Sequence, residues 1–389
     1  MIEAWDFVEA ARGFGFRWYA GVPCSFLTPF INYVLQDESL RYVSMANEGD
    51  AVALMAGVAL AGDGRGGFGH GITMMQNSGL GNAVSPLTSL TWTFKLPQLL
   101  IITWRGQPGI ADEPQHSLMG PITPQVLKSM DIPWELFPTD ANELRPALGR
   151  ATDYMRREQR PYAFLMQKGS VADYPLRRQT ALPAPPTAAA RIQPAGAEQP
   201  TRNEALRAVI AATDQRVAIL ATTGFCGREL YALADRANQL YMVGSMGCVV
   251  PLALGLALAR PEQRVLALDG DGAALMRLGA YATVGAYAPT NLSHLLLDNA
   301  AHDSTGGQAT VSKSVDFARL AAACGYADCS ELADSAALAG WLVPSASGPR
   351  FARLQIRSGT PKGLPRPTIT PEEVRVRFMR HFADLHAAP

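Results

Sequence analysis

One stretch in the second half of this sequence limits the possible fold most. A short apolar run (265–269) leads into a Gly-Asp-Gly turn, a segment of helical length (273–287) and a second apolar run (294–297). Both runs are short enough for buried strands, so the stretch predicts a strand–helix–strand unit with two parallel neighbouring strands. Ligands of such sheets bind beyond the carboxyl ends of the strands, where Asp271 and Asn299 would converge.

The side chains of Asp271 and Asn299 offer hard oxygen ligands, which suit magnesium or calcium better than zinc or copper. Gly270 and Gly272 would let the backbone approach a phosphate closely. The expected helix, which starts near Ala273, offers its free N–H groups to the same phosphate. An isolated Asp-Gly turn would carry no such meaning, but the polar pair at the end of the next strand favours a metal and phosphate site.

Gly-Asp-Gly followed, after a helix and a strand, by Asn-Asn resembles the signature of thiamine diphosphate (ThDP) enzymes. The resemblance implies that Asp271, Asn299 and the backbone carbonyl of Ala301 hold Mg²⁺. It also implies that the diphosphate lies on Gly270, Gly272 and Ala273. This chain has Asp298 in place of the first Asn. Because that position is not a metal ligand, the predicted metal site is unaffected.

Composition excludes several classes of protein. The chain has 389 residues, enough for two domains, and a formal net charge of zero, which argues against nucleic acid as a partner. Its five cysteines form no CxxC pair, as expected for a reducing compartment. The N-terminus does not resemble a signal peptide, and no apolar run reaches membrane length. We therefore expect a cytoplasmic protein that does not bind membranes and that self-associates.

Strands and helices alternate through about residue 170 and again from Arg202, as parallel α/β domains require. A Pro/Ala-rich stretch, 181–200, separates them and reads as an extended linker. We predict an α/β fold with domains 1–180 and 201–389. The other expected helices cover 5–15, 25–36, 51–60, 228–240, 251–259 and 371–385, and the other expected strands cover 16–20, 42–45, 99–103, 163–167, 217–220, 241–243 and 351–356.

Glu48 lies between an expected strand and an apolar helix. A carboxylate at this position could serve only the helix start, where the helix dipole favours it. Segment 48–57, however, is similar to the ThDP-enzyme segment whose glutamate hydrogen-bonds the pyrimidine ring of the cofactor. The resemblance implies that Glu48 lets the cofactor form its carbanion, while the protein orients and polarises it. The two domains would then be a pyrimidine-binding domain followed by a diphosphate-binding domain.

Three loops of the second half could be simple turns, and the same resemblance gives them roles at the cofactor. Met246, in the Gly-Ser-Met-Gly loop, would prop the cofactor in a bent shape, and Ser245 beside it would contact the pyrimidine. The loop Thr222-Thr223-Gly224 would lie on the diphosphate side. Ser304 follows the metal-binding Asn and would lie over the diphosphate.

The first half carries a further resemblance, in the strings 74–82, 104–109 and 112–116. They are similar to one subgroup of ThDP enzymes, the phosphonopyruvate decarboxylases, with sulfopyruvate decarboxylases as near relatives. This likeness implies a carboxy-lyase that converts 3-phosphonopyruvate to phosphonoacetaldehyde and carbon dioxide in phosphonate antibiotic biosynthesis. Gln76 and Asn77 would contact the cofactor. Alternatives are sulfopyruvate decarboxylation, or another ThDP-dependent decarboxylase or C–C ligase; the fusion of both halves in one chain favours phosphonopyruvate.

The substrate would be a small anionic 2-oxo acid, whose phosphonate needs cations or N–H donors. Candidates are Ser25, Arg105 and His116, with His116 and His302 as proton-transfer groups. Arg105 could equally form an ion pair, and His116 could be a loop histidine with its hydrogen bonds satisfied. Cys24 stands where relatives often have Asp, and we expect a small filler there. In this family the site lies between two subunits, so at least a homodimer is implied.

Overall fold

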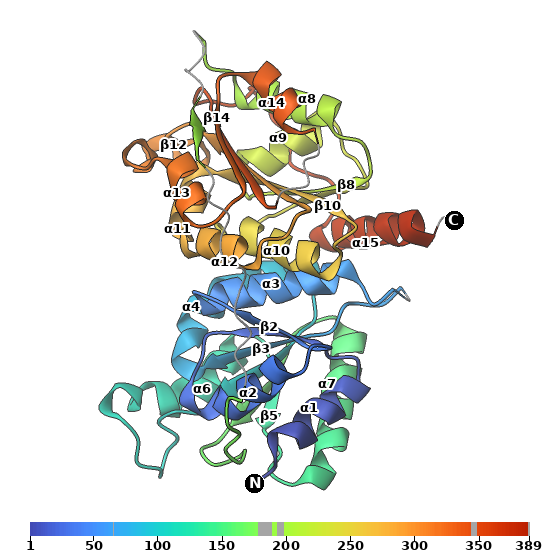
Figure 1. The fold of residues 1–389 in the computed structure, drawn as a ribbon, viewed down its shortest axis with the longest axis vertical. Coiled ribbons are helices and arrows are strands. Elements are labelled where there is room, and N and C mark those ends of the chain that lie inside the picture. Colours follow the sequence, from blue (N-terminus) through green and yellow to red (C-terminus); the bar gives the residue numbers. More distant parts are fainter. Residues whose placement is uncertain (65, 178–188, 193–197, 344–347, 388–389) are drawn as a thin grey trace. The chain divides into compact units, whose positions relative to one another are not determined.

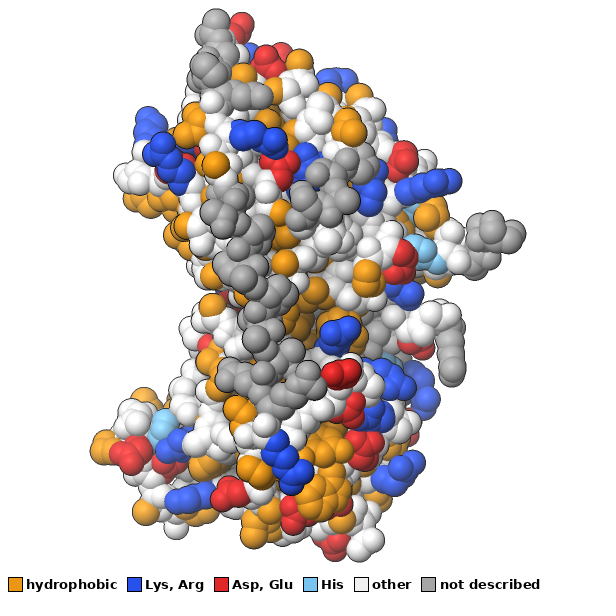
Figure 2. Space-filling model, viewed as in Figure 1, with side chains coloured by type: hydrophobic (Ala, Val, Ile, Leu, Met, Phe, Trp, Pro, Cys, Tyr) orange, Lys and Arg blue, Asp and Glu red, His pale blue; other side chains and the backbone are white. Residues whose placement is uncertain are grey.

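The computed structural model describes residues 1–64, 66–177, 189–192, 198–343 and 348–387. The chain separates into two compact units, Met1–Ala181 and Leu182–Pro389 (Figure 1). Within the described part, no helix combines the length and apolar character that crossing a membrane requires. On the face shown in Figure 2, acidic and basic side chains are interspersed rather than gathered by sign, consistent with the zero net charge.

A six-stranded parallel sheet forms the first unit, in the order β2-β1-β3-β4-β6-β5. The chain runs from β1 outward to β2 and then adds β3 on the other side of β1. The strand order therefore reverses between β1 and β3, where open α/β sheets bind ligands. The elements are β1 (Trp18–Gly21), β2 (Arg41–Ser44), β3 (Gly71–Gln76), β4 (Leu99–Thr103), β5 (Trp134–Leu136), β6 (Tyr162–Met166), α1 (Ala4–Gly13), α2 (Thr28–Gln36), α3 (Glu48–Ala61), α4 (Leu80–Pro86), α5 (Trp92–Phe94), α6 (Met119–Ser129) and α7 (Ala141–Glu158).

Strand β4 shows why this sheet is covered on both faces. Its side chains alternate between two buried clusters, because successive residues of a strand point to opposite faces. Leu99 and Ile101 belong to the cluster that includes residues of α1, α2 and α7. Leu100 and Ile102 belong to the cluster that includes residues of α3, α4 and α6. The sheet is thus the middle layer of three, as Figure 1 shows.

A seven-stranded parallel sheet forms the second unit, in the order β7-β14-β15-β11-β10-β8-β9. Here the order reverses between β8 and β10. A short antiparallel pair, β12 and β13, lies beyond β11. The elements are β7 (Arg191–Ile192), β8 (Val217–Ala221), β9 (Gln239–Tyr241), β10 (Arg264–Gly270), β11 (Leu292–Asp298), β12 (Ala301–His302), β13 (Gln308–Ala309), β14 (Asp328–Leu332), β15 (Arg350–Gln355), α8 (Arg202–Ala212), α9 (Phe225–Leu233), α10 (Val249–Ala259), α11 (Asp271–Met276), α12 (Gly279–Tyr287), α13 (Phe317–Ala323), α14 (Ser335–Trp341) and α15 (Pro371–Ala387).

The expected strand–helix–strand unit is confirmed in its strands and corrected in its helix. Strands β10 and β11 pair in parallel from Val265 opposite Leu292 to Gly270 opposite Leu297. The single helix expected over 273–287 is wrong, because α11 ends at Met276 and α12 starts at Gly279. Arg277 between them leaves the helical region, at φ −141° and ψ 50°.

One other expectation fails for a tertiary reason, and one boundary shifts. The helix expected over 228–240 ends at Leu233, because Gln239–Tyr241 pairs with β8 as an edge strand. Asn238, the residue before this strand, is held in place by a hydrogen bond of 2.7 Å from its Nδ2 to the Val217 carbonyl. The helix expected from about Ala51 is confirmed but begins at Glu48, where the Asn47 side chain caps it by accepting from the Gly49 N–H.

The stretch expected to be a linker, 181–200, contains part of the second sheet. Residues 181–188 and 193–197 lie outside the described part of the chain, but Arg191 and Ile192 form β7, paired with Ser330 and Glu331 of β14. Arg191 also makes an ion pair with Asp328. The segment therefore supplies an edge strand, which its Pro/Ala-rich composition did not indicate.

Candidate cofactor and metal site

A pocket of about 150 Å³ opens where the strand order of the second unit reverses. Its walls are the loops that follow β8, β10 and β11, so it lies at the carboxyl ends of these strands, as expected for a parallel sheet. The pocket brings together most site residues predicted for this half of the chain: Thr222, Thr223, Gly224, Met246, Gly270, Asp271, Gly272, Ala273, Asn299, Ala301, His302 and Ser304. Ser245 is buried next to Met246 with φ 52°, a left-handed conformation that turns the loop there.

The predicted magnesium ligands fit a hard cation. Asp271 is buried and accepts a hydrogen bond from the Thr310 hydroxyl, and burial raises the pKa of its carboxyl. Among the described residues no cationic side chain forms an ion pair with Asp271, so a bound cation would compensate a buried charge that is otherwise costly. Asn299 Oδ1 contacts the Ala301 N–H at 3.2 Å. Carboxylate, amide and carbonyl oxygens are the ligands Mg²⁺ prefers.

A second observation concerns the shape of this turn. A Cβ atom built on Gly272 would lie 2.5 Å from Cε1 of His302 and 3.0 Å from Cε of Met246. Glycine therefore lets both side chains rest against the backbone of the turn. Within the described residues no group of three or more His, Cys, Asp and Glu side chains could hold a metal ion. The predicted Mg²⁺ ligands would not form such a group, because only one of them, Asp271, is a carboxylate and the other two are an amide and a backbone carbonyl.

Asp298, the departure from Asn-Asn, has a structural role in the fold. Its Oδ2 accepts hydrogen bonds from Arg353 at 2.8 Å and 2.7 Å, and its Oδ1 accepts from Ser312 and the Ala300 N–H at 2.9 Å each. This carboxylate fixes the turn that carries Asn299. Sequence reasoning placed Asp298 outside the metal site but had no signal for its partner, because Arg353 is 55 residues further along the chain.

In the first unit, Glu48 occupies the first turn of α3. Its Oε2 accepts a hydrogen bond of 2.8 Å from Asn82 Nδ2. A Cβ on Gly79 would lie only 2.6 Å from Glu48 Oε1, so glycine leaves room for this carboxylate. The helix start is capped by Asn47, whose side chain accepts from the Gly49 N–H. Glu48 is therefore not the cap, and its carboxylate is held from α4.

Other predicted residues gather where the order of the first sheet reverses. Cys24 Sγ lies 3.4 Å from Gln76 Oε1 and 3.4 Å from Thr103 Oγ1, so the ends of β1, β3 and β4 meet there. The adjacent Asn77 is buried, and its Oδ1 has no hydrogen-bond partner among the described residues. Its amide donates to the Arg105 carbonyl at 2.8 Å and to the Thr123 hydroxyl at 2.9 Å, which positions neighbouring loops.

The predicted substrate residues differ in availability. Arg105 donates from Nε to Asp112 Oδ2 over 2.8 Å and also contacts Oδ1, and this hydrogen bonding holds the pKa of Asp112 well below its usual range. The ion-pair alternative for Arg105 is therefore realised in this structure. Ser25 is exposed. His116 is buried, and its Nδ1 has no hydrogen-bond partner in the part of the chain that the structure describes.

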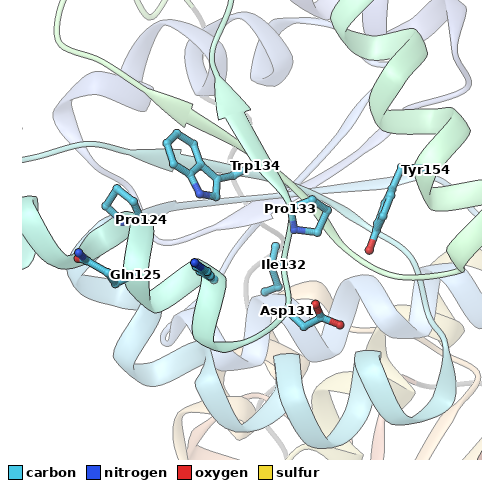
Figure 3. A pocket seen from close by; sticks show the side chains of 8 residues that line it. Pro124, Gln125, Asp131, Ile132, Pro133, Trp134 and Tyr154 are labelled. Carbon is cyan, nitrogen blue, oxygen red and sulfur yellow. The ribbon is translucent and has the colours of Figure 1, made fainter.

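A larger hollow, of about 660 Å³, lies elsewhere in the first unit (Figure 3). Its lining comes from α6, α7 and the residues that precede and begin β5, and none of the predicted site residues belongs to it. It lies at the amino end of β5, whereas ligands of parallel sheets bind at the carboxyl ends. This hollow is larger than the pocket at Asp271, but only the pocket at Asp271 contains the predicted metal and phosphate ligands.

Two comparisons bear on the fold. Residues 228–343 match the family model of the thiamine pyrophosphate enzyme C-terminal TPP binding domain. The fold also resembles the crystal structure of benzoylformate decarboxylase from Polynucleobacter necessarius, with a TM-score of 0.68 and 11% sequence identity. That likeness covers 93% of this chain and 100% of the other. The chain thus has the two-domain α/β fold of ThDP enzymes.

Sequence similarity extends over nearly the whole chain. A phosphonopyruvate decarboxylase from Streptomyces viridochromogenes is 46% identical over 383 residues, covering 97% of this chain and 94% of that protein. A phosphonopyruvate decarboxylase from Streptomyces hygroscopicus is 45% identical, with 98% and 94% covered. The chain therefore belongs to the phosphonopyruvate decarboxylase family of thiamine diphosphate enzymes.

Proposed function

We propose that this protein decarboxylates 3-phosphonopyruvate to phosphonoacetaldehyde and carbon dioxide, with ThDP and Mg²⁺ as cofactors. The observation that carries the proposal is the 46% identity to a phosphonopyruvate decarboxylase over nearly all of the chain. The pocket at Asp271 supports it independently, because a buried carboxylate beside glycine turns suits a metal-bound diphosphate. In the reaction the substrate carboxylate leaves as carbon dioxide, and a proton takes its place on carbon.

The second unit would hold the cofactor. Asp271, Asn299 and the Ala301 carbonyl would bind Mg²⁺. The diphosphate would contact the loop Thr222-Thr223-Gly224, the turn Gly270 to Ala273, and Ser304. Ser245 and Met246 would support the pyrimidine side. Bound ThDP would supply the carbon nucleophile and the electron sink that decarboxylation of a 2-oxo acid requires.

The first unit would supply proton and substrate chemistry. Glu48, held by Asn82, would share a proton with the pyrimidine ring. Gln76 would meet the cofactor with its side chain. Asn77 would do so with its buried Oδ1, which has no hydrogen-bond partner among the described residues, because its Nδ2 is engaged with Arg105 and Thr123.

The remaining roles concern the substrate. Ser25, Arg105 and His116 would receive the phosphonate, and His116 or His302 would deliver the proton to carbon. The unpartnered Nδ1 of His116 supports a ligand near it, because a buried polar atom without a hydrogen bond is costly. For Arg105 to contact the phosphonate, the substrate would have to compete with Asp112.

The proposed setting is a cytoplasmic homo-oligomer that acts in phosphonate antibiotic biosynthesis. Glu48 and Asp271 belong to different units of the chain, and in ThDP enzymes two such halves of a site come from two subunits, which supports at least a dimer. The formal net charge of zero and the hydrophobic fraction of 48% support self-association.

The test is turnover of phosphonopyruvate by the purified protein, with and without ThDP and Mg²⁺. Sulfopyruvate and pyruvate serve as control substrates, and carbon dioxide and the aldehyde are both quantified. We expect phosphonoacetaldehyde in equal amount to carbon dioxide, dependent on both cofactors. Faster turnover of sulfopyruvate, or coupled products instead of an aldehyde, would contradict the proposal.

A further inference from the structure

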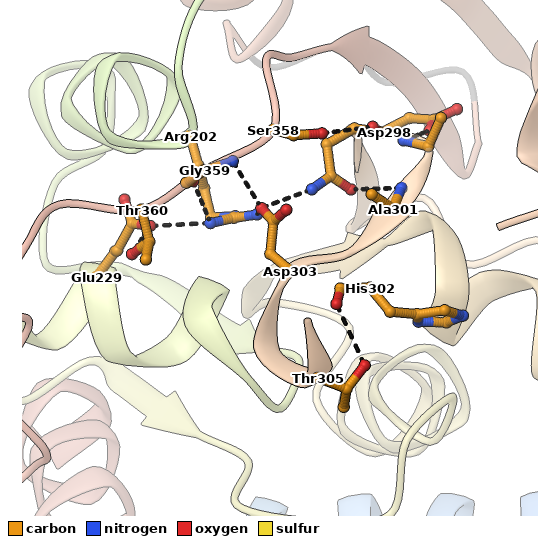
Figure 4. Close-up of polar contacts among 12 residues, drawn as sticks. Arg202, Glu229, Asp298, Ala301, His302, Asp303, Thr305, Ser358, Gly359 and Thr360 are labelled. Atoms are coloured by element: carbon orange, nitrogen blue, oxygen red, sulfur yellow. Dashed lines mark hydrogen bonds and ion pairs between the residues drawn. The ribbon is translucent and has the colours of Figure 1, made fainter. Parts of the chain in front are cut away.

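A buried arginine at the start of α8 has no role in the proposed reaction. Arg202 is 7% exposed, and it is the first residue of the helix, where the helix dipole disfavours a cation. A buried charge at such a place requires strong partners. Two carboxylates provide them: Nη1 donates to Glu229 Oε1 over 2.9 Å, and Nη2 donates to Asp303 Oδ2 over 2.6 Å. Figure 4 shows Arg202 between Glu229 and Asp303.

Asp303 connects this arginine to the proposed metal ligand. Its Oδ2 accepts three hydrogen bonds, from Arg202, from Asn299 Nδ2 at 2.7 Å and from the Gly359 N–H at 3.0 Å. An ionised carboxylate can only accept, so the amide of Asn299 must turn its NH₂ group toward Asp303. Because the amide is planar, its Oδ1 then faces away from Asp303. This oxygen accepts a hydrogen bond from the Ala301 N–H at 3.2 Å, and its second lone pair is left for a cation.

Residues 202 and 303 bring together distant parts of the chain. Arg202 also donates to the Gly359 carbonyl at 3.2 Å, and the Thr360 hydroxyl donates to Glu229 at 3.0 Å. The Asn299 carbonyl accepts from the Ser358 hydroxyl at 3.1 Å, as part of the same network. The start of α8 and segment 358–360 thereby hold the turn of Asn299 through contacts other than those of Asp298.

We propose that Arg202 is a positioning residue for the metal site, which acts through Asp303 to orient the Asn299 amide. The inference rests on the proposed function, which makes Asn299 a Mg²⁺ ligand. Without the guanidinium, the Glu229 and Asp303 carboxylates lose the cation between them, and only the Gly359 N–H and the Asn299 amide still hold Asp303. The Asn299 amide can then rotate or invert. Groups that orient metal ligands typically change metal affinity by about 10- to 100-fold when removed.

The experiment measures Mn²⁺ binding to the metal-free, full-length protein with ThDP present, from the electron paramagnetic resonance signal of free Mn²⁺. Arg202→Met and Asp303→Ala should each raise the dissociation constant about 10- to 100-fold. Arg202→Lys should recover part of the loss, because an ammonium reaches fewer partners than the planar guanidinium. The double variant should bind no more weakly than the weaker single variant, because both changes break one chain of contacts.

Arg350→Met is the matched control. The Arg350 side chain is as buried as that of Arg202, at 8%, and pairs with Asp328 at 3.0 Å, but it does not line the pocket. Both arginine variants should melt at lower temperature, whereas only Arg202→Met should bind Mn²⁺ more weakly. If Arg202→Met does not fold, Asp303→Ala decides, because it leaves Arg202 paired with Glu229.

Two results would overturn the inference in different ways. Normal Mn²⁺ binding by Arg202→Met or Asp303→Ala, with normal binding by the wild type, would refute the positioning role alone. Additive losses in the double variant would also refute it, since the two residues would then act independently. Absence of ThDP-dependent Mn²⁺ binding in the wild type would instead reject the proposed metal site, and the inference with it.

Discussion

Between β1 and β3 of the first unit and between β8 and β10 of the second, the strand order reverses in the same way. The two positions are lined by different chemistry. In the first, the side chains of Cys24, Gln76 and Thr103 meet, and the guanidinium of Arg105, paired with Asp112, lies next to Cys24. In the second, the Asp271 carboxylate lies beside glycine turns and close to charged groups that include Arg202 and Asp303.

The difference shows that one backbone arrangement can serve two tasks. Fixed charges suit a metal and a diphosphate, since both are permanently charged. Groups that exchange protons, such as Glu48 and His116, suit the reacting end of a site, where protons move and charge changes. Function on a shared fold is therefore set by loop residues rather than by the sheet. The three predictions below test whether the first unit governs turnover and the second governs cofactor binding.

The largest effect should come from Glu48→Gln. The amide keeps the shape of the side chain but cannot exchange a proton as the carboxylate does, so kcat should fall about 10²- to 10⁴-fold. Mn²⁺ and ThDP affinities should stay near those of the wild type, as measured by calorimetry. Unchanged turnover would show that Glu48 takes no part in the mechanism. A large loss of metal affinity would show that the first unit also governs cofactor binding.

Asp271→Ala should have the opposite pattern. It removes the single carboxylate of the predicted metal set, so the dissociation constant for Mn²⁺ in the presence of ThDP should rise more than about 100-fold, beyond the usual effect of outer groups. Dialysis of the variant should remove ThDP as well. Retention of both cofactors at wild-type affinity would reject the ligand assignment. Thr310→Val keeps the carboxylate and loses the hydroxyl contacts with Asp271 and the Ser312 N–H, so it should give a smaller loss.

Gly79→Ala should give the smallest of the three effects. The new Cβ would lie 2.5 Å from Cγ of Glu48, so the carboxylate must move, and kcat should fall by up to about 100-fold. Gly81→Ala is the control, because a Cβ there meets nothing within 4 Å. In α4 the control should stabilise the fold by up to about 0.5–1 kcal/mol, measured by thermal unfolding. Equal kinetics in both variants would show that Gly79 does not position Glu48.

Much of the second site could be predicted because its residues follow one another along the chain. The Gly-Asp-Gly turn and Asn299 lie at the ends of adjacent buried strands, and parallel pairing brings such ends together. The contact between Asn82 and Glu48 depends on helix α4, which places Asn82 one turn after Gly79. Its place in the polar string 74–82 was the available signal.

The rest depends on contacts between distant residues. Arg202 and Asp303 are 101 residues apart, and neither carries a motif. The helix expected over 228–240 failed for the same reason. Its residues include Ala and Leu, which favour helices, but the pairing of the edge strand β9 with β8 outweighs that preference. Propensity and spacing describe neighbours in sequence, whereas these features are set by neighbours in space.

Strand β7 has a practical consequence for protein engineering. The two halves could be expressed as separate polypeptides from a divided gene. Judged from the sequence alone, any point in 181–200 would be suitable for the cut. A cut after Ile192 would leave β14 without its outer partner and would expose the backbone groups that now pair at Ser330 and Glu331. A cut upstream of Arg191 keeps all seven strands on one polypeptide, and fragments with that start should be the less aggregation-prone of the two designs.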